Sequence, residues 1–339
     1  MMPEEWPIAA FAADRPVDPA RPRGPSRLAT VRRDFFLDPA DRLTEQERAL
    51  MSAMLGDFIA ALATEIGLAA GHGPGAENTP KILSKVTKAG LLNRGGLLSL
   101  MLRRADEHRI ASAFASHAGP RKLPLMSRLV GDPSPAVASA AMALVVARGR
   151  RRDGFGQPRI ELSDLAPDDV VALTHAVAAA MCTSGTDEAV HAAAAEQISE
   201  SVRYDESLDR AVEQLAAALH RGHEKEDRLI EEASGEGEAA LAAHILARRA
   251  GVTPQAAWDH LLDAGDGGLA LLARMAGLGR QSAARLIADF GAMIGTSSIE
   301  VEMVRFDTLG EAEVAAALAH WRLPRPFRIA RTMVGNGNG

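Results

Sequence analysis

The sequence predicts an all-α protein, built as a degenerate array of helical hairpins, from three observations. Alanine fills 65 of the 339 positions, and alanine is the best helix former and a poor strand former. Apolar residues recur at three- and four-residue steps in one segment after another, which is the spacing of amphipathic helices. Only residues 298–306 alternate with period two, so we expect a short strand or extended segment there and no sheet of three or more strands.

The two ends of the chain differ in composition from the middle. Six prolines fall within residues 3–27, and proline fixes the backbone and removes hydrogen-bond donors, so we expect an extended arm. Glycine alternates with asparagine in the last five residues, which predicts a flexible tail. With the Gly/Pro-containing segment 154–158 as an internal linker, the predicted organisation is an arm over 1–27, helical repeats over 28–153, helical repeats over 160–334 and a tail over 335–339.

The first clear helix begins after Thr44. Its hydroxyl can cap the backbone while Glu47, three residues later, reaches back to the cap. Four apolar side chains then follow at four-residue steps and predict one stripe that faces a neighbouring helix: Leu50, Met54, Phe58 and Leu62.

Further helices follow in order, separated by Gly- or Pro-containing turns. Pro80 suits the first turn of the second helix, and a third is expected over 96–118. The next begins at residues 132–135 and is expected to pack through Val137, Ala141, Leu144 and Val145. The remaining expected helices are 167–183, 186–202, 205–221, 237–250, 254–264, 268–277, 280–290 and 310–321.

Two stretches carry a resemblance to known proteins. The segment Asp132-Pro133-Ser134-Pro135-Ala136-Val137, continuing to Leu144, resembles the start of the second helix of a HEAT repeat, although Ala138 stands where a basic residue is usual. Residues 238–278, together with the segment 33–62, look like a bacterial family of unknown function with HEAT-like helical repeats. The resemblance implies an all-helical interaction or regulatory protein, and it carries over no catalytic residue.

Composition also bounds where the protein is expected to act. With Cys182 as its one cysteine, the chain has no internal disulfide and no cysteine-based zinc site. The N-terminus lacks the basic region and the apolar run of a signal peptide. The longest uncharged stretch, 170–186, is short and contains polar residues, so we expect a cytoplasmic protein with no membrane partner.

Charge is distributed unevenly along the chain. The net charge of −6 divides into +7 over residues 1–160 and −13 over residues 161–339. Such a division is typical of a protein whose basic half meets an anionic partner, of one whose halves meet each other, or simply of solvated helix faces.

Signatures of catalysis and of cofactor binding are missing. The sequence contains no phosphate-binding loop, no Gly-x-Ser-x-Gly elbow and no Ser-x-x-Lys pair, so we predict no catalytic residues and no cofactor. His220 and His223, with Glu224 and Glu226, have the spacing of metal ligands, but Gly222 interrupts the helix and surface residues are favoured. The other single histidines, His175, His191 and His244, are expected to pack.

Two arginine sets are the candidate partner-binding residues. Arg148, Arg150, Arg151 and Arg152 follow an apolar helix, and we expect them to project into solvent, where they can grip an acidic protein or phosphates. Arg322, Arg325 and Arg328 surround Trp321 and Phe327, a mixture typical of protein interfaces or of a terminal cap that packs its aromatics.

One glycine-rich turn has a second interpretation. Residues 277–286 are similar to a helix-hairpin-helix turn, in which backbone amides contact phosphate, but a glycine that ends one repeat helix explains the same residues.

On balance the sequence predicts a non-enzymatic scaffold or regulatory adaptor that binds a protein partner. The alternatives are a nucleic-acid-binding repeat protein that uses the basic half and, less favoured, a DNA-repair enzyme on a HEAT-like scaffold.

Overall fold

The computed structural model describes residues 44–73, 78–117, 123–182, 187–222, 227–262, 267–294 and 298–336. Over these residues the protein is all-helical, and the one extended pairing is an isolated antiparallel bridge between Arg152 and Pro158. The first eight α-helices of the described residues are α2 (Glu45–Ala69), α3 (Thr79–Lys88), α4 (Gly95–His117), α5 (Leu125–Val130), α6 (Pro135–Arg150), α7 (Pro167–Met181), α8 (Glu188–Ser201) and α9 (Leu208–Gly222). They are followed by α10 (Asp227–Gly235), α11 (Ala239–Ala250), α12 (Pro254–Leu261), α13 (Gly268–Met275), α14 (Arg280–Ile294), α15 (Ile299–Thr308), α16 (Glu311–Trp321) and α17 (Arg325–Asn336).

Local chemistry accounts for several of the helix ends. The hydroxyl of Thr44 accepts from the backbone of Glu47 while the Glu47 carboxylate accepts from the backbone of Thr44, which confirms the predicted capping box. Pro80 stands in the first turn of α3, as predicted. At the end of α11, Gly251 adopts the left-handed conformation, with φ of 65°, in which a side chain is disfavoured.

The segment predicted as a strand or extended is helical. Residues 299–308 form α15, capped by the Ser298 hydroxyl, which accepts from the backbone of Glu300. Its buried residues, Glu302, Met303 and Phe306, are spaced by one and three positions, as one face of a helix requires. The sequence-based prediction also omitted the short helices α5 and α10 and the terminal helix α17, which extends to Asn336 and so includes the first two residues of the expected tail. The arm expected over 1–27 lies outside the described residues.

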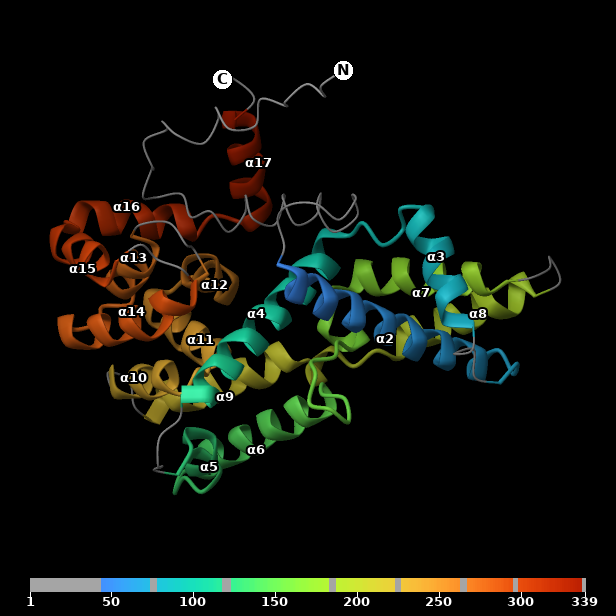
Figure 1. Cartoon of the computed structure of the whole chain (residues 1–339), viewed down its shortest axis with the longest axis horizontal. Coiled ribbons are helices and arrows are strands. Elements are labelled where there is room, and N and C mark those ends of the chain that lie inside the picture. The colour runs from blue at the N-terminus through green and yellow to red at the C-terminus, as the bar shows by residue number, and fades with distance from the viewer. Residues whose placement is uncertain are drawn as a thin grey trace, which may run out of the picture.

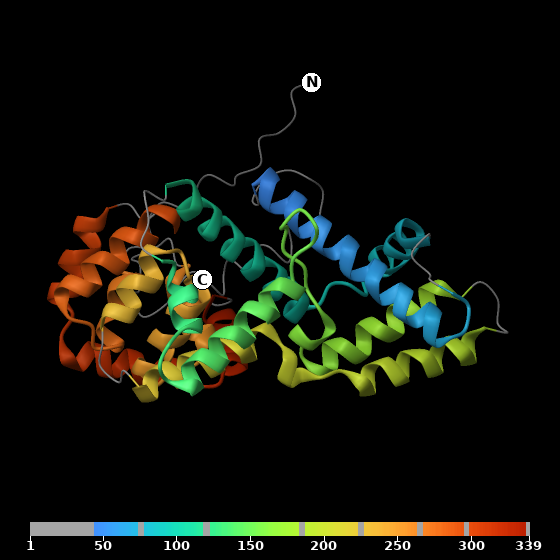
Figure 2. The same cartoon turned by 90° about the horizontal axis from the view of Figure 1, so that it is seen from below.

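The buried apolar side chains form two clusters. One joins α2, α3, α7 and α8 with the first part of α4, and the other joins α5, α6 and α9–α16 with the end of α4. Figures 1 and 2 show these groups at opposite ends of the long axis, with α4 crossing between them. The predicted linker at 154–158 does not coincide with this division, because helices that follow it, α7 and α8, pack on α2.

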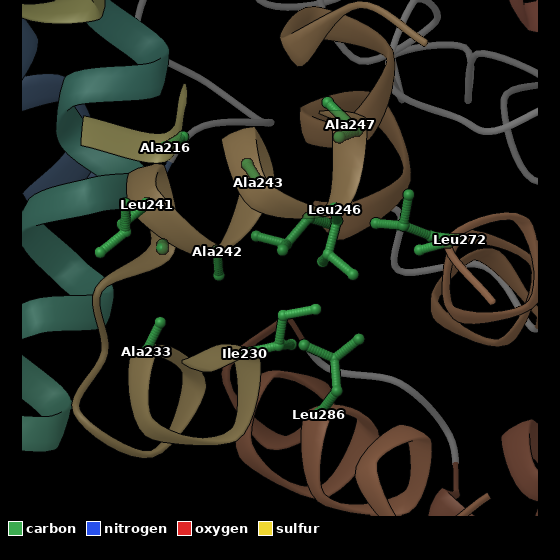
Figure 3. Packing of buried hydrophobic residues seen from close by; sticks show 14 of the residues in the cluster. Ala216, Ile230, Ala233, Leu241, Ala242, Ala243, Leu246, Ala247, Leu272 and Leu286 are labelled. Atoms are coloured by element: carbon green, nitrogen blue, oxygen red, sulfur yellow. The ribbon is translucent and has the colours of Figure 1, made fainter. Parts of the chain in front are cut away.

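Alanine permits close packing in the larger cluster. Helix α11 lies at its centre, with Ala242 and Ala243 fully buried, so the backbones of α9 and α10 come near that of α11. Figure 3 shows the surrounding side chains, which come from α9, α10, α11, α13 and α14: Ala216, Ile230, Ala233, Leu241, Leu246, Ala247, Leu272 and Leu286.

Helix α2 is the one described helix that is long and apolar enough to cross a membrane, judged by length and composition alone. Core helices of other proteins pass the same test. Nine residues of α2 are buried, Phe58 and Ile59 among them, and the helix packs against α3, α4, α7 and α8.

Candidate functional site

The first arginine set lies at the end of α6, where the two clusters meet. Arg148 donates from Nη1 and Nη2 to the two carboxylate oxygens of Glu238, at 3.1 and 2.5 Å, and so ties the end of α6 to the start of α11. Arg150 is exposed and donates to Glu206 at 2.9 Å. Both guanidinium groups are therefore engaged by carboxylates of this chain.

Arg151 corrects the expectation that this set projects into solvent. Its side chain is 3% exposed, and its Nε donates to both carboxylate oxygens of Asp164, at 2.7 and 3.0 Å. The other guanidinium nitrogens donate to the backbone oxygens of Ala147 and Glu206 and to the Ser163 hydroxyl. Arg151 is buried because the last turn of α6 faces the short 3-10 helix Leu162–Asp164, which supplies these acceptors.

Arg152 differs from its neighbours. Its side chain is exposed, and no ion pair with another described residue involves it. Burial, and then the charge of Arg152, lower the pKa of His108, and both side chains line the same cavity. Of the four arginines, Arg152 is the one whose charge is available to a partner.

Two cavities lie on either side of this turn. The first, of about 130 Å³, is lined by Arg104, His108, Arg148, Arg151 and Arg152 on one side and by the start of α11 on the other. The second, of about 450 Å³, lies between α2, α8 and the segment 159–163. The larger cavity has an apolar floor that includes Phe58 and Ile198, and a rim of paired charges that includes Arg150.

Ion pairs join the basic half of the chain to the acidic half. Arg103 and Arg104 of α4 both contact Asp209 of α9, at 2.5 and 3.1 Å. Burial alone would raise the pKa of Asp209, but the two guanidinium groups hold it well below its usual range. Arg94 pairs in the same way with Asp169, at 2.5 Å. The uneven charge of the sequence is thus partly neutralised inside the molecule.

The second arginine set is mostly structural. Arg322 donates to the carbonyl oxygens of Gly251 and Ala250 and so satisfies the exposed end of α11. Arg328 is buried, with its guanidinium 4.1 Å from the centre of the Trp321 ring. Arg325 is half-buried. Burial of Trp321 agrees with the predicted terminal cap, whereas Phe327 is exposed.

The turn that is similar to a phosphate-binding hairpin already holds a carboxylate. Gly277 ends α13 in the left-handed conformation, with φ of 64°, and the Gly279 amide donates to Asp227 Oδ2 at 2.9 Å. Arg249 holds the same carboxylate at 2.6 Å and also donates to the Gly277 carbonyl. The Asp227 side chain therefore takes a place that a phosphate would need, which favours the packing interpretation.

Metal-ligand geometry is not found in the described part of the chain, where no group of three or more His, Cys, Asp or Glu side chains lies together. His223, Glu224 and Glu226 fall outside the described residues, so the predicted cluster around His220 is not placed. Among the histidines expected to pack, His191 is buried beside the carbonyl of Asp187, at 2.9 Å, and stacks on His72.

Sequence reasoning missed an exposed apolar face on α6. This helix packs against α5 and α9, and its outer side carries Met142, Val145 and Val146, which are 48, 42 and 52% exposed. Val145 was expected in the packed stripe, but it lies one position beyond Leu144 and so about 100° around the helix. Helical spacing alone could have separated these two faces, because Val137, Ala141 and Leu144 are buried while positions 142 and 146 form their own i, i+4 pair.

Comparison with known proteins places the chain in a family. A family model described as an uncharacterised protein conserved in bacteria (DUF2336) matches residues 108–318, which run from the second half of α4 into α16. No curated protein and no solved structure matches significantly.

Proposed function

This chain belongs to the DUF2336 family of uncharacterised bacterial proteins, and from that premise we propose that it is a non-enzymatic helical-repeat adaptor that binds a protein partner. The order of packing supports a degenerate repeat array. The helices pack in a row in which α5 contacts α6, α6 contacts α9, α9 contacts α11, α11 contacts α13 and α13 contacts α15. The hairpin of α7 and α8 leaves this row and packs on α2 and α3.

The observation that carries the proposal is the internal pairing of the basic half. Arg103, Arg148 and Arg151 all contact carboxylates of this chain, so phosphate groups would have to displace ion pairs that are already made. Nucleic-acid binding draws its affinity from cations that are free to replace counterions. The alternative of a nucleic-acid-binding protein is therefore the weaker one.

The open face of α6 is the proposed contact surface. Met142, Val145 and Val146 present a contiguous apolar strip at the edge of the array, and Arg152 follows it at the end of the helix. A group of apolar side chains with an arginine beside it is typical of protein interfaces. The partner that fits is an apolar helix or strand bordered by at least one carboxylate.

Site-specific cross-linking in the bacterial host tests this proposal. A photoreactive amino acid at Val146 should capture a protein, whereas the same group at Val171, an equally exposed valine on α7, should not capture it. With the captured partner purified, Met142→Lys should weaken binding by about tenfold or more, since it places a charge in an apolar contact. Val171→Lys is the matched control.

A nucleic-acid binding assay tests the alternative function. The intact chain should show no saturable binding to duplex DNA or to RNA at physiological salt. Saturable binding whose salt dependence becomes shallower in Arg152→Ala would overturn the proposal, because the slope counts the phosphates that are neutralised. A cytoplasmic location belongs to the same proposal and can be checked by fractionation of the host.

A further inference from the structure

The terminal helix α17 is attached to the body through a charged side chain. Of its described residues only Arg328 is buried, while the apolar residues Phe327 and Val334 are 52 and 70% exposed. Figure 1 shows α17 projecting from the body beyond α16. Surface helices ordinarily bury an apolar stripe, so attachment by a guanidinium group calls for an explanation.

Arg328 enters a socket made by the ends of α12 and α16. Its guanidinium carbon lies 4.1 Å from the centre of the Trp321 ring, and its Nη1 lies 4.0 Å from Asp259 Oδ2. Nε donates to the carbonyl oxygen of Leu323 at 3.3 Å. Trp321 and Asp259 are both buried. An aromatic face, a carboxylate and a carbonyl oxygen are the three groups that recognise a guanidinium.

The floor of the socket holds polar atoms that have no partner among the described residues. His260 is fully buried, its ring centre lies 4.4 Å from that of Trp321, and neither of its ring nitrogens is hydrogen-bonded to a described residue. The indole nitrogen of Trp321 is also buried, and no described residue accepts a hydrogen bond from it. Burial, and then the charges of Arg328 and His320, lower the pKa of His260 to about 3, so the ring is neutral and one nitrogen can accept a hydrogen bond. Buried polar side chains are nearly always hydrogen-bonded, which makes this set an unusual one.

We propose that Trp321, Asp259 and His260 form a guanidinium-binding site for an arginine side chain of a protein partner, and that Arg328 of α17 occupies this site as an internal competitor. Arginine fits better than lysine because its planar group can stack on the indole while its edge donates to Asp259 and His260. The site is separate from the face of α6, so its failure would leave the proposed function of that face untouched.

Occupancy by Arg328 has a measurable consequence. The apparent affinity of a ligand that binds only after α17 has detached is reduced to the fraction of molecules in which the site is free. Removing the Arg328 guanidinium should therefore strengthen binding of an added guanidinium compound. Arg331, an exposed arginine on the same helix, provides the matched control.

The first experiment uses methylguanidine as the probe and the indole N–H resonance of Trp321 as the readout. In Arg328→Ala the resonance should shift saturably with methylguanidine and not with methylammonium. To reach the same shift, the wild-type chain and Arg331→Ala should need a methylguanidine concentration at least about tenfold higher than Arg328→Ala needs. Arg328→Met, which keeps an apolar stem, repeats the measurement in case the alanine variant does not fold. Equal affinity in all variants, or an equal response to methylammonium, would overturn the proposal.

The second experiment uses the wild-type chain and asks whether a peptide displaces α17. A peptide that copies residues 322–336 should raise hydrogen exchange in residues 325–336, and the same peptide with Arg328→Lys should not. Free agmatine carries a guanidinium without a peptide, so displacement by agmatine at equal concentration would assign the site to a small molecule and overturn the partner assignment. If α17 detaches more as the concentration of the protein itself is raised, the site belongs to a second copy of the chain. That result would also overturn the partner assignment. If the variants of the first experiment do not fold, this second experiment still decides the proposal, because it uses the wild-type chain.

Discussion

Arg151 and Asp164 form a buried ion pair at the place where the two core clusters meet. The Arg151 guanidinium lies 2.7 Å from Asp164 Oδ2, and each side chain is almost completely withdrawn from solvent. Asp164 also accepts from the backbone amides of Leu208 and Glu161. One carboxylate thus joins the end of α6, the short 3-10 helix and the start of α9, and fixes how these segments meet.

Removal of this carboxylate should be strongly destabilising. Asp164→Ala leaves the buried Arg151 charge with Glu161 as its one remaining carboxylate and leaves the amides of Leu208 and Glu161 without their acceptor. We expect a loss of about 3–5 kcal/mol in the free energy of unfolding. Asp57→Ala is the control, because Asp57 is half-exposed and its ion pair with Arg159 is 3.9 Å long, so the loss should stay below about 1 kcal/mol. Denaturant titration of both variants checks the prediction, and equal midpoints would contradict it.

A charge on the buried face of α2 should also destabilise the protein strongly, whereas one on its exposed face should not. Leu55 is buried among α2 and its neighbours, and Leu55→Asp would bury an unpaired carboxylate, at a cost of about 3 kcal/mol or more. Leu68, on the same helix, is exposed, and Leu68→Asp should cost less than about 1 kcal/mol. Thermal melting followed by circular dichroism distinguishes the two, and a stable Leu55→Asp variant would show that α2 is peripheral.

Gly237 should not tolerate a side chain. Its φ of +71° is unfavourable for other residues, and a Cβ placed there would lie 2.7 Å from Cδ2 of Phe114. Backbone strain and overpacking together should make Gly237→Ala less stable by about 2–4 kcal/mol. Gly154→Ala meets open space and a favourable backbone, so its melting temperature should match that of the wild type. A melting temperature of Gly237→Ala within error of Gly154→Ala would refute this account.

Stability should fall as the pH drops below neutrality. Burial lowers the pKa of His260 to about 3 and that of His244 to about 4, against 6.5 without the fold. Between about pH 6.5 and pH 4 the unfolded chain therefore binds protons that the folded chain does not, so the free energy of unfolding decreases with falling pH. Each histidine contributes a slope of about 1.4 kcal/mol per pH unit in that range.

Replacement of one histidine isolates its share of this slope. His260→Leu should reduce the slope by the contribution of one group while leaving that of His244 in place. Urea titrations at intervals between about pH 4.5 and pH 6.5 provide the measurement, because most carboxylates are still ionised there. An unchanged slope in His260→Leu would mean that the imidazole reaches water in the folded protein.

Most of the fold follows from local patterns, and the errors have physical causes. Capping chemistry placed the start of α2 at Thr44 correctly, because a cap depends only on residues within one turn. Residues 298–306 were misassigned because the alternating Ile299 and Val301 are exposed and do not mark the buried face. The buried Met303 and Phe306 lie three positions apart, as on one face of a helix, and the Ser298 hydroxyl caps that helix. Helices α5 and α10 are too short to show a period of their own.

The sites were harder to predict, because they depend on residues far apart in the chain. The sequence shows four arginines between 148 and 152, but not that Glu238, Asp164 and Glu206 lie opposite three of them. Among the alternatives for the uneven charge, contact between the halves of the chain explains these pairs. The guanidinium socket joins residues of α12, α16 and α17, and no spacing along the chain indicates that arrangement.

Single changes at Arg151 and Arg152 should separate a structural role from a binding role. Arg151→Ala leaves Asp164 buried without its partner, so we expect a loss of about 3–5 kcal/mol in stability. Arg152 is exposed and pairs with no described carboxylate, so Arg152→Ala should change stability by less than about 0.5 kcal/mol. A change of all four arginines at once would mix these effects, because Arg148 and Arg150 also hold carboxylates of this chain.

Binding of the partner captured at Val146 completes this comparison. If Arg152 meets a carboxylate at the rim of that interface, Arg152→Ala should lower mainly the association rate, and the loss should shrink as salt is raised, because rim charges steer the encounter. Arg210→Ala removes an exposed arginine of α9 that pairs locally with Glu213, and it should leave the association rate unchanged. Kinetics at low and at physiological salt measure both variants alongside their melting temperatures. Equal association rates for wild type and Arg152→Ala would remove Arg152 from the interface, while Met142→Lys would still test the apolar face on its own.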